Sequence, residues 1–143
     1  MTRFAVVAAL VLLLPPATAL AASTELKAAA NGHFVTTADI NGASVRVLVD
    51  TGATAVALSY EDAQDAGLRP GRLDYNVPVV TANGMVQAAK VTIRRIAIDN
   101  VKIEDVDGMV LPEGAMTGSL LGMSFLSRLQ SFRVEDGVLF LRN

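Results

Sequence analysis

The amino-acid sequence predicts an all-β domain, a barrel or sandwich with one or two short helices. Short segments rich in Val, Ile, Leu and Thr follow one another along residues 34–141. Turn sequences such as Asn41-Gly42 and Asp136-Gly137 separate them and favour tight β-hairpins. The chain has 143 residues, which is enough for one domain with a core and too short for two ordinary domains.

The N-terminal segment differs from the rest of the chain. Arg3 precedes an uninterrupted apolar run over residues 4–14, which two prolines and a set of alternating alanines follow. This is the pattern of a secretory signal peptide with a small-residue cleavage site. We therefore expect residues 1–22 to be a signal peptide, or a membrane anchor formed by residues 4–22. The domain is then exported to the periplasm, either free or anchored to the inner membrane.

The first elements of the exported part are assigned from local patterns. Residues 23–33 are polar and Ala-rich, and we interpret them as a linker or short helix before a domain at residues 34–143. The first hairpin joins expected strands at 34–40 and 44–49, and a short apolar strand follows at 55–58.

The remaining elements alternate between strands and turns. Ser59 is a helix N-cap with an acid three residues later, and Gly67 stands where a C-cap glycine ends a helix of about two turns. The further expected strands are 77–81, 85–93, 97–98, 101–106, 108–111, 132–134 and 138–141, with a short helix at 123–129.

Composition excludes several classes of function. The net charge is −2, which argues against a broad surface for nucleic acid, and Arg94-Arg95 is interpreted as a solvated strand end. The chain has no cysteine, so it has no disulfide, thiolate metal site or cysteine nucleophile. Its one histidine, His33, is interpreted as a surface residue. We expect no metal and no cofactor.

Asp39, Asp99 and Asp136 are interpreted as surface turn residues, and one further acidic residue differs from them. Asp50 ends an apolar strand and is followed by Thr51-Gly52-Ala53. A carboxylate among apolar neighbours is costly to ionise without partners, so we expect backbone N–H groups and a hydroxyl to hold it. Gly52 lets the backbone turn tightly there. The alternative is an ordinary aspartate in a β-turn.

A second motif, Ser119-Leu120-Leu121-Gly122, lies about 70 residues further along and leads into the last expected helix. Taken alone, it is a buried strand that feeds a helix. A hairpin with Asn83-Gly84 near its tip lies between the two motifs. In this order the three elements resemble the retropepsin-like (clan AA) aspartic proteases, the single-domain relatives of pepsin, and most closely the exported bacterial members. The resemblance covers residues 34–141.

The resemblance implies a closed β-barrel half-domain with one or two short helices that forms a twofold dimer. It assigns Asp50 as the catalytic residue. The residues that it assigns to the support of the active-site loop are Thr51, Gly52 and Ala53, with the Thr51 hydroxyls bonded across the twofold axis. It assigns Ala82, Asn83, Gly84 and Met85 to a flap over the substrate cleft. It assigns Leu120, Leu121 and Gly122 to the element that passes through the active-site loop.

The chain departs from the retroviral members at one pair of positions. Those enzymes usually carry an Asp after the Ala of the active-site loop and an Arg after the Gly that leads into the helix, and the two residues pair. Here the positions hold Thr54 and Met123. Both charges are absent together, so neither is left buried alone.

The chemistry requires two carboxylates that share one proton, and this chain has one Asp-Thr-Gly. The second carboxylate therefore comes from another copy, and we expect an aspartic endopeptidase active as a homodimer on protein or peptide substrates. The C-terminal hairpin or the N-terminal strand is the candidate for pairing across the dimer. The alternatives are a non-enzymatic peptide-binding or dimerisation module on the same fold, and a monomer of unrelated function.

Overall fold

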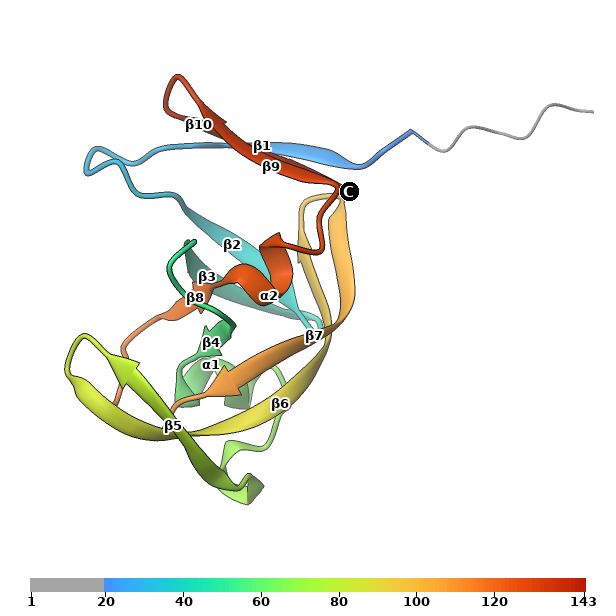
Figure 1. The fold of residues 1–143 in the computed structure, drawn as a ribbon. Coiled ribbons are helices and arrows are strands. Elements are labelled where there is room, and N and C mark those ends of the chain that lie inside the picture. The colour runs from blue at the N-terminus through green and yellow to red at the C-terminus, as the bar shows by residue number, and fades with distance from the viewer. Residues whose placement is uncertain (1–19) are drawn as a thin grey trace, which may run out of the picture.

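The computed structural model describes residues 20–143, which form two β-sheets and two short α-helices (Figure 1). The strands of the larger sheet are β2 (Val35–Ile40), β3 (Ala43–Val49), β4 (Val56–Leu58), β5 (Tyr75–Thr81), β6 (Gly84–Ile98), β7 (Val101–Val110) and β8 (Ser119–Leu121). Those of the smaller sheet are β1 (Ser23–Lys27), β9 (Ser131–Glu135) and β10 (Val138–Arg142). The helices are α1 (Tyr60–Asp65) and α2 (Met123–Leu126), and a 3₁₀ turn spans Pro70–Arg72.

The larger sheet closes into a barrel. Its strand order is β2-β3-β8-β4-β7-β6-β5, and β2 also pairs with β6. The ring therefore runs β2-β3-β8-β4-β7-β6, while β5 pairs with β6 outside the ring and carries that hairpin away from the barrel (Figure 1). The expected all-β barrel with short helices is confirmed.

The turns of the hairpins agree with their sequences. Asn41 and Gly42 both have positive φ (52° and 92°), as do Asp136 and Gly137 (50° and 74°). Two consecutive residues at positive φ are the signature of the tight turn whose twist matches that of paired strands, and Asn-Gly and Asp-Gly adopt it readily. These turns join β2 to β3 and β9 to β10.

The expected linker or short helix at residues 23–33 is wrong over its first half, because residues 23–27 form strand β1. This strand pairs antiparallel with β10, with Ser23 opposite Arg142 and Lys27 opposite Val138. The pairing extends beyond the strand, since Asn143 N donates to Ala22 O at 2.9 Å. The order of the smaller sheet is thus β1-β10-β9.

The strands expected at 85–93 and 97–98 are one strand, β6, so Arg94-Arg95 is not a strand end. Arg95 holds the strand across the barrel closure: its N–H donates to Asn41 Oδ1 at 3.0 Å, and its guanidinium pairs with Asp39 at 3.2 Å. Asp39, expected as a surface turn residue, therefore belongs to the closure. The N–H of Gly42 and the Arg95 guanidinium hold the pKa of Asp39 below its usual range.

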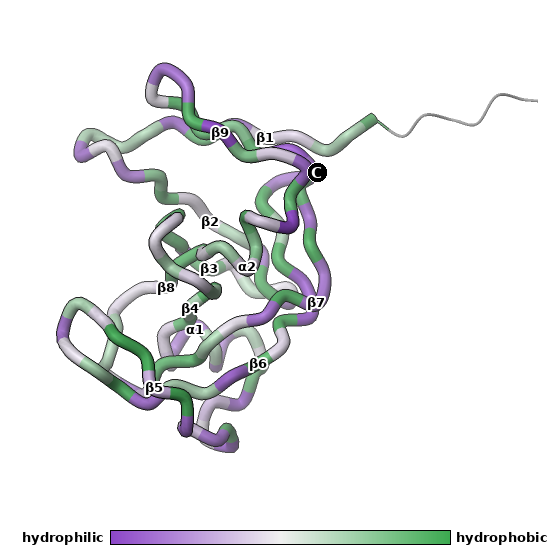
Figure 2. The backbone as a smooth tube through the Cα atoms, in the orientation of Figure 1, coloured by the Kyte–Doolittle hydropathy of each residue, from purple (hydrophilic) through white to green (hydrophobic). Residues whose placement is uncertain are grey.

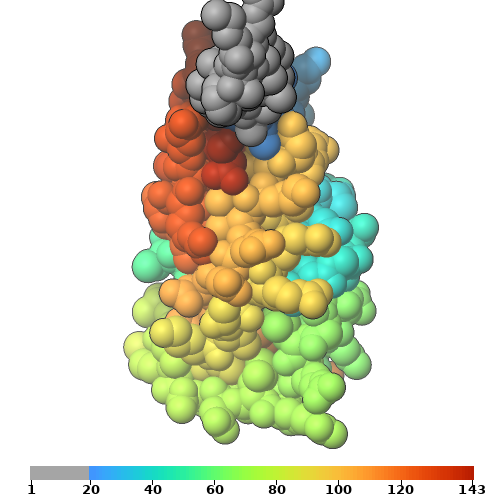
Figure 3. Space-filling view, turned by 90° about the vertical axis from the view of Figure 1, so that its right-hand side faces the viewer, coloured from blue at the N-terminus to red at the C-terminus, as the bar shows by residue number. Residues whose placement is uncertain are grey.

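The strands expected at 101–106 and 108–111 are likewise one strand, β7, which pairs with β6 over its whole length. Figure 2 shows hydrophobic and hydrophilic stretches alternating along both strands, as a barrel wall with one buried face requires. Figure 3 shows these two strands across the middle of one face of the molecule, with C-terminal segments on one side and the N-terminal strands on the other.

The core lies inside the barrel and beneath the helices. Its largest fully buried side chains are Phe125, Ile40, Leu58, Ile93, Ile96, Ile98, Leu121, Leu126 and Leu141. Ser59 caps α1 as expected, because its Oγ accepts from Asp62 N at 3.1 Å, and Gly67 follows the helix at φ 73°. Helix α2 ends at Leu126, earlier than the expected residue 129. Among residues 20–143, neither helix is long and apolar enough to cross a membrane.

Candidate active site

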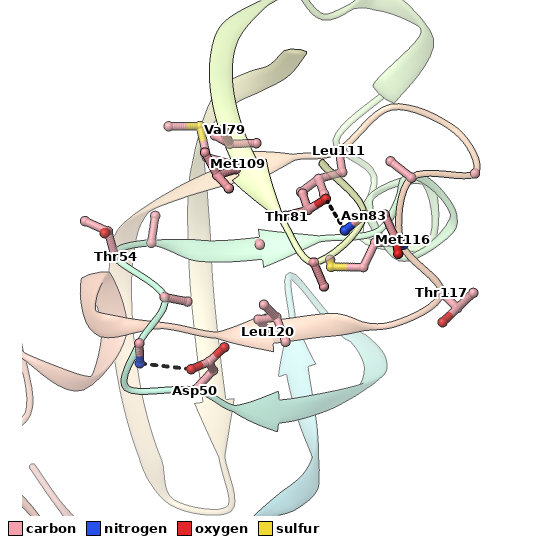
Figure 4. Close-up of a pocket in the computed structure, with 18 residues that line it drawn as sticks. Asp50, Thr54, Val79, Thr81, Asn83, Met109, Leu111, Met116, Thr117 and Leu120 are labelled. Carbon is pink, nitrogen blue, oxygen red and sulfur yellow. Dashed lines mark hydrogen bonds between the residues drawn. The ribbon is translucent and has the colours of Figure 1, made fainter. Parts of the chain in front are cut away.

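Asp50 lies directly after β3, at the start of a tight turn that leads to β4. The Asp50 N–H donates to Leu121 O at 3.1 Å, and Ala53 N donates back to Asp50 O at 3.2 Å. The carboxylate Oδ1 accepts from Gly52 N at 2.9 Å (Figure 4). Gly52 thus supplies one of the expected backbone N–H groups, whereas no hydroxyl among residues 20–143 donates to the Asp50 carboxylate.

The expected apolar enclosure of Asp50 is absent from the single chain. Asp50 is half-buried, while Thr51 and Gly52 on the same turn are exposed. The flanking apolar residues Leu48 and Val49 belong to β3 and are themselves half-buried. Asp50 is therefore only partly enclosed by the described residues.

Strand β8 passes between the two strands that flank the Asp50 turn. It pairs in parallel with β3, with Leu121 opposite Val49, and antiparallel with β4, with Leu120 opposite Ala57. Leu121 is fully buried below the turn, whereas Leu120 lines the cleft above it. Leu120 and Leu121 thus lie between the strands on either side of the Asp50 turn, and their role in an active site stays a prediction.

Gly122 fits this position because a larger residue has no room. A Cβ atom there would lie 2.3 Å from Ala55 O and 2.7 Å from Ala53 O, which are backbone atoms. The next residue fixes the turn from the other side, since Met123 N donates to Ala53 O at 2.8 Å. The Asp50 turn is therefore held between β8 and the start of α2.

Two serines to which the sequence assigned no role, Ser119 and Ser124, add further hydrogen bonds near this turn. Ser124 Oγ accepts from Val56 N at 2.9 Å and donates to Asp107 O at 2.6 Å. The buried Ser119 Oγ accepts from Ser59 N at 3.1 Å and donates to Asp62 Oδ2 at 2.5 Å. The available signal was their place in the sequence, because they flank the apolar-apolar-Gly element on both sides.

Thr54 and Met123, at the positions of the retroviral ion pair, have different environments. Thr54 is exposed and lines the cleft, while Met123 is half-buried and packs against the core. The hydroxyl of Ser124, one residue after Met123, supplies a polar tie between α2, β4 and β7.

A cleft of about 870 Å³ lies between the Asp50 turn and the β5–β6 hairpin (Figure 4). Residues from the turn, β4, the hairpin, β7 and the 111–117 segment line it. They are Asp50, Gly52, Ala53, Thr54, Ala55, Ala57, Val79, Val80, Thr81, Ala82, Asn83, Met109, Leu111, Gly114, Ala115, Met116, Thr117 and Leu120. Asp50 is the one ionisable side chain among these lining residues.

The β5–β6 hairpin supplies the roof of this cleft. Of the four residues expected in a flap, Ala82 and Asn83 line the cleft, whereas Gly84 and Met85 do not, and Met85 is 69% exposed. The tip has local hydrogen bonds: Thr81 Oγ1 donates to Gly84 O at 2.8 Å and accepts from Asn83 N at 3.2 Å. In Figure 4 the tip approaches Met116 from the opposite wall.

The cleft formed by the described residues holds one carboxylate, that of Asp50. No other acidic side chain lines the cleft with Asp50. Residues 20–143 also contain no cluster of three or more His, Asp or Glu side chains that could hold a metal ion. Thr51 does not line this cleft but lines an adjoining cavity, as does His33.

The gag-polyprotein putative aspartyl protease family model matches residues 36–128. The chain belongs to this family. Among solved structures, the chain is similar to a retropepsin-like aspartic protease from Rickettsia conorii. The two are 33% identical, and the match has a TM-score of 0.77 and covers 86% of this chain and 92% of that one. It also resembles the EIAV protease complexed with the inhibitor HBY-793, at 23% identity and a TM-score of 0.57 over 71% of this chain and 91% of that one, which shows the shared fold. The expected retropepsin-like family and fold are confirmed.

Two curated relatives are named as uncharacterized. One is a protein in the cobV 5′ region of Sinorhizobium sp, 45% identical over 79% of this chain and 48% of its own length. The other is protein RP867 of Rickettsia prowazekii (strain Madrid E), 37% identical over 78% of this chain and 47% of its own length. The chain thus spans about half the length of the curated relatives it matches.

Proposed function

We propose that this retropepsin-like protein is an aspartic endopeptidase whose active site forms at a homodimer interface. The observation that carries the proposal is the placement of Asp50, which a threaded turn holds at the floor of a cleft of about 870 Å³ without another carboxylate. A twofold axis beside Asp50 would bring its own copy next to it and would enclose the side that a single chain leaves open.

In the proposed mechanism the two Asp50 carboxylates share one proton, since like charges about 3 Å apart do not both ionise. The ionised carboxylate removes a proton from a water molecule, whose oxygen attacks the scissile carbonyl carbon. The protonated carboxylate donates a hydrogen bond to the carbonyl oxygen. The carboxylate that took the proton from water then gives it to the nitrogen, and collapse of the tetrahedral intermediate breaks the C–N bond. Water is the only co-reactant.

The substrate is a peptide in extended conformation between the flap and the Asp50 floor. Backbone hydrogen bonds and alternating side-chain pockets suit such a cleft. Its walls are mostly apolar, with Met109, Met116 and Leu120 among them, so the flanking pockets favour uncharged side chains. The flap tip closes over the bound peptide and excludes water from the reaction.

The experiment that tests this function is a peptide-library digest of the purified protein and its Asp50→Asn variant. Removing one ionisable group from each half of the dyad should lower the cleavage rate by at least about 100-fold. Asp65→Asn, which changes an exposed carboxylate on α1, is the matched control and should cleave as the parent does. Equal cleavage by the parent and Asp50→Asn would refute the mechanism.

The second candidate is a non-enzymatic peptide-binding or dimerisation module. The exposed Asp50 turn supports it, because a dimer could use this surface without catalysis. This candidate predicts that no peptide is cleaved at acidic or neutral pH and that Asp50→Asn leaves the dimer unchanged. Sedimentation and the digest together separate the two functions.

We also propose that the domain acts in the periplasm. The support is the leader expected at residues 1–22, of which residues 1–19 lie outside the described part. The exported domain is then either free, after cleavage of the leader, or anchored to the membrane through residues 4–22. Cell fractionation with N-terminal sequencing of the recovered protein tests both, and recovery from the cytoplasm with an intact leader would contradict export.

A further inference from the structure

The sulfur atoms of the described residues are gathered around the substrate cleft. The chain has no cysteine, and the methionines within residues 20–143 are Met85, Met109, Met116 and Met123. Met109 and Met116 line the cleft, and Met85 directly follows the flap tip. The N–H of Met123 holds the Asp50 turn from below. None of the four is among the fully buried residues of the core, so these side chains do not serve to fill it.

Met116 lies on the wall that the flap tip approaches. It belongs to the irregular 111–117 segment, and in Figure 4 its side chain points across the cleft toward Asn83. The polar groups of the tip are bonded within the tip, because Thr81 Oγ1 donates to Gly84 O and accepts from Asn83 N. An apolar thioether therefore faces the flap where the two walls meet.

The sulfur of Met116 is also within reach of the solvent. The residue is half-buried, and its neighbours Gly114, Thr117 and Gly118 are exposed. Irregular surface segments with few buried contacts open more readily than strands do. A small oxidant dissolved in water can therefore reach this side chain.

The other three methionines lie in different surroundings. Met85 is 69% exposed, but it does not line the cleft, and it pairs with the exposed Val80. Met109 lines the cleft from within β7, where strand pairing with β6 on one side and β4 on the other limits its movement. Met123 packs against the core. Met116 thus combines an open position with a place directly opposite the flap.

We propose that Met116 is a site of reversible oxidation, at which conversion to methionine sulfoxide keeps the flap from closing over the cleft. The oxidant is a hydroperoxide. Its terminal oxygen forms an S–O bond with the thioether sulfur as the O–O bond breaks, and the sulfur loses two electrons. The proton of the transferred hydroxyl passes to the leaving oxygen, which departs as water or an alcohol. The effect on cleavage rests on the proposed function.

The sulfoxide changes the flap because it places a polar oxygen on an apolar wall. Leu111 and Leu120 are among the side chains that share this cleft, and the Asn83 N–H is already bonded to Thr81. Closing the tip over the new oxygen would remove its water, and burying a polar group without a partner is costly. The open flap is therefore favoured until the sulfoxide is reduced again.

Peroxide treatment of the purified full chain tests the site directly. The parent, Met116→Leu and Met85→Leu proteins are treated with hydrogen peroxide, and the oxidised residues are mapped by mass spectrometry. We expect kcat/KM of the parent to fall about tenfold, in step with the addition of oxygen at Met116. Treatment with methionine sulfoxide reductases, one for each sulfoxide epimer, should restore the value.

The two leucine variants separate Met116 from the methionine of the flap. Leucine keeps an apolar side chain of similar volume and has no sulfur to oxidise. Each protein is compared with its own untreated sample, so differences in basal rate do not enter. Met85→Leu should lose kcat/KM on treatment as the parent does, whereas Met116→Leu should keep it. Equal inactivation of Met116→Leu and the parent would overturn the proposal, as would a parent in which Met116 takes up no oxygen.

Hydrogen exchange gives a second measurement, which does not need catalysis. Oxidation of the parent should speed exchange of the backbone amides of residues 79–86 about threefold or more, since the flap then opens more often. Met116→Gln places a polar side chain of similar length there and should exchange like the oxidised parent without any peroxide. Met116→Leu should exchange like the reduced parent before and after treatment. Slow exchange in both the oxidised parent and Met116→Gln would contradict the effect on the flap.

These outcomes are separable from the fate of the proposed function. A protein that cleaves peptides equally well with Met116 reduced or oxidised keeps its function and refutes this inference. A protein that cleaves nothing, but whose flap exchanges faster when Met116 is oxidised, keeps the oxidation site and refutes the protease. A protein that shows neither cleavage nor a change in flap exchange refutes both.

Discussion

The two sides of the substrate cleft are built in opposite ways. The Asp50 turn is fixed by contacts from distant parts of the chain, through Leu121, Gly122 and Met123. The flap tip opposite is held by hydrogen bonds within residues 81–84 and is exposed. The conformation of the cleft floor therefore depends on contacts with other elements, whereas that of the roof depends on contacts within the flap itself.

This difference matches what the proposed mechanism requires of each side. A general base needs a carboxylate held in a fixed place, and a turn supported by β8 and α2 provides it. A roof over an extended peptide has to open, which is easier for a hairpin with few buried contacts. Mutations in the floor should therefore cost stability, while mutations in the roof should change activity with little effect on stability.

The largest effect is expected for Gly122→Ala. Its Cβ would meet backbone atoms of Ala53 and Ala55, which cannot move without displacing the Asp50 turn. We expect the free energy of unfolding to fall by about 3 kcal/mol or more, measured by chemical denaturation. Gly118→Ala, where a Cβ has open space, is the control and should change stability by less than about 0.5 kcal/mol. A stable Gly122→Ala protein would refute the rigid floor.

A smaller loss is expected for Ser124→Ala. The substitution leaves Val56 N–H and Asp107 C=O without their shared partner, which should cost about 1–3 kcal/mol in unfolding free energy. Ser127→Ala, at the residue that directly follows this helix, removes an exposed hydroxyl that donates to Met123 O, and it should cost less than about 0.5 kcal/mol. Equal losses in the two variants would show that Ser124 adds nothing specific to the floor.

The roof should behave differently in Thr81→Val, which keeps the shape of the side chain and removes both tip hydrogen bonds. We expect the unfolding free energy to change by less than about 1 kcal/mol, because the bonds are exposed and local. The value of kcat/KM should fall several-fold, since a less ordered flap closes less often over substrate. A loss of unfolding free energy as large as that of Gly122→Ala would show that the roof contributes as much to stability as the floor does.

The smallest effect is expected at the barrel closure, away from both sides of the cleft. Because the folded-state pKa of Asp39 lies below its unfolded value, its stabilising contribution is present above about pH 4 and is lost as the pH falls through the lower folded value. Asp39→Asn should therefore be less stable than the parent at pH 6 and equally stable near pH 2 by chemical denaturation. A constant difference at every pH would show that the charge of Asp39 is not the cause.

The sequence predicts the local features of this molecule well. Ser59 caps its helix, Asn41-Gly42 and Asp136-Gly137 turn their hairpins, and Asp50 lies on a tight turn, because each depends on neighbours in the sequence. The paired motifs around Asp50 and Gly122 predict the floor of the site, since their order along the chain fits one known arrangement.

The errors concern pairings between distant segments. Residues 23–27 carry no strand pattern of their own and become β1 only through β10. The double arginine interrupts an apolar pattern, yet β6 continues because Asp39 and Asn41 of the neighbouring hairpin bind Arg95. Asp50 stands on a turn whose Thr51 and Gly52 are exposed, and this is why the apolar sequence around it predicts more burial than the structure shows.

The parallel pairing of β3 with β8 also bears on when the site can first exist. It joins Val47 to Ser119 and Leu48 to Leu120, so the closing segment is synthesised long after the Asp50 turn. Closing so long a loop is entropically costly, and contacts of this range form slowly. A growing chain therefore carries Asp50 on an unsupported turn until residues 119–121 have been synthesised, about 70 residues later. The order of the strands thus delays the assembly of the cleft floor until β8 has been made.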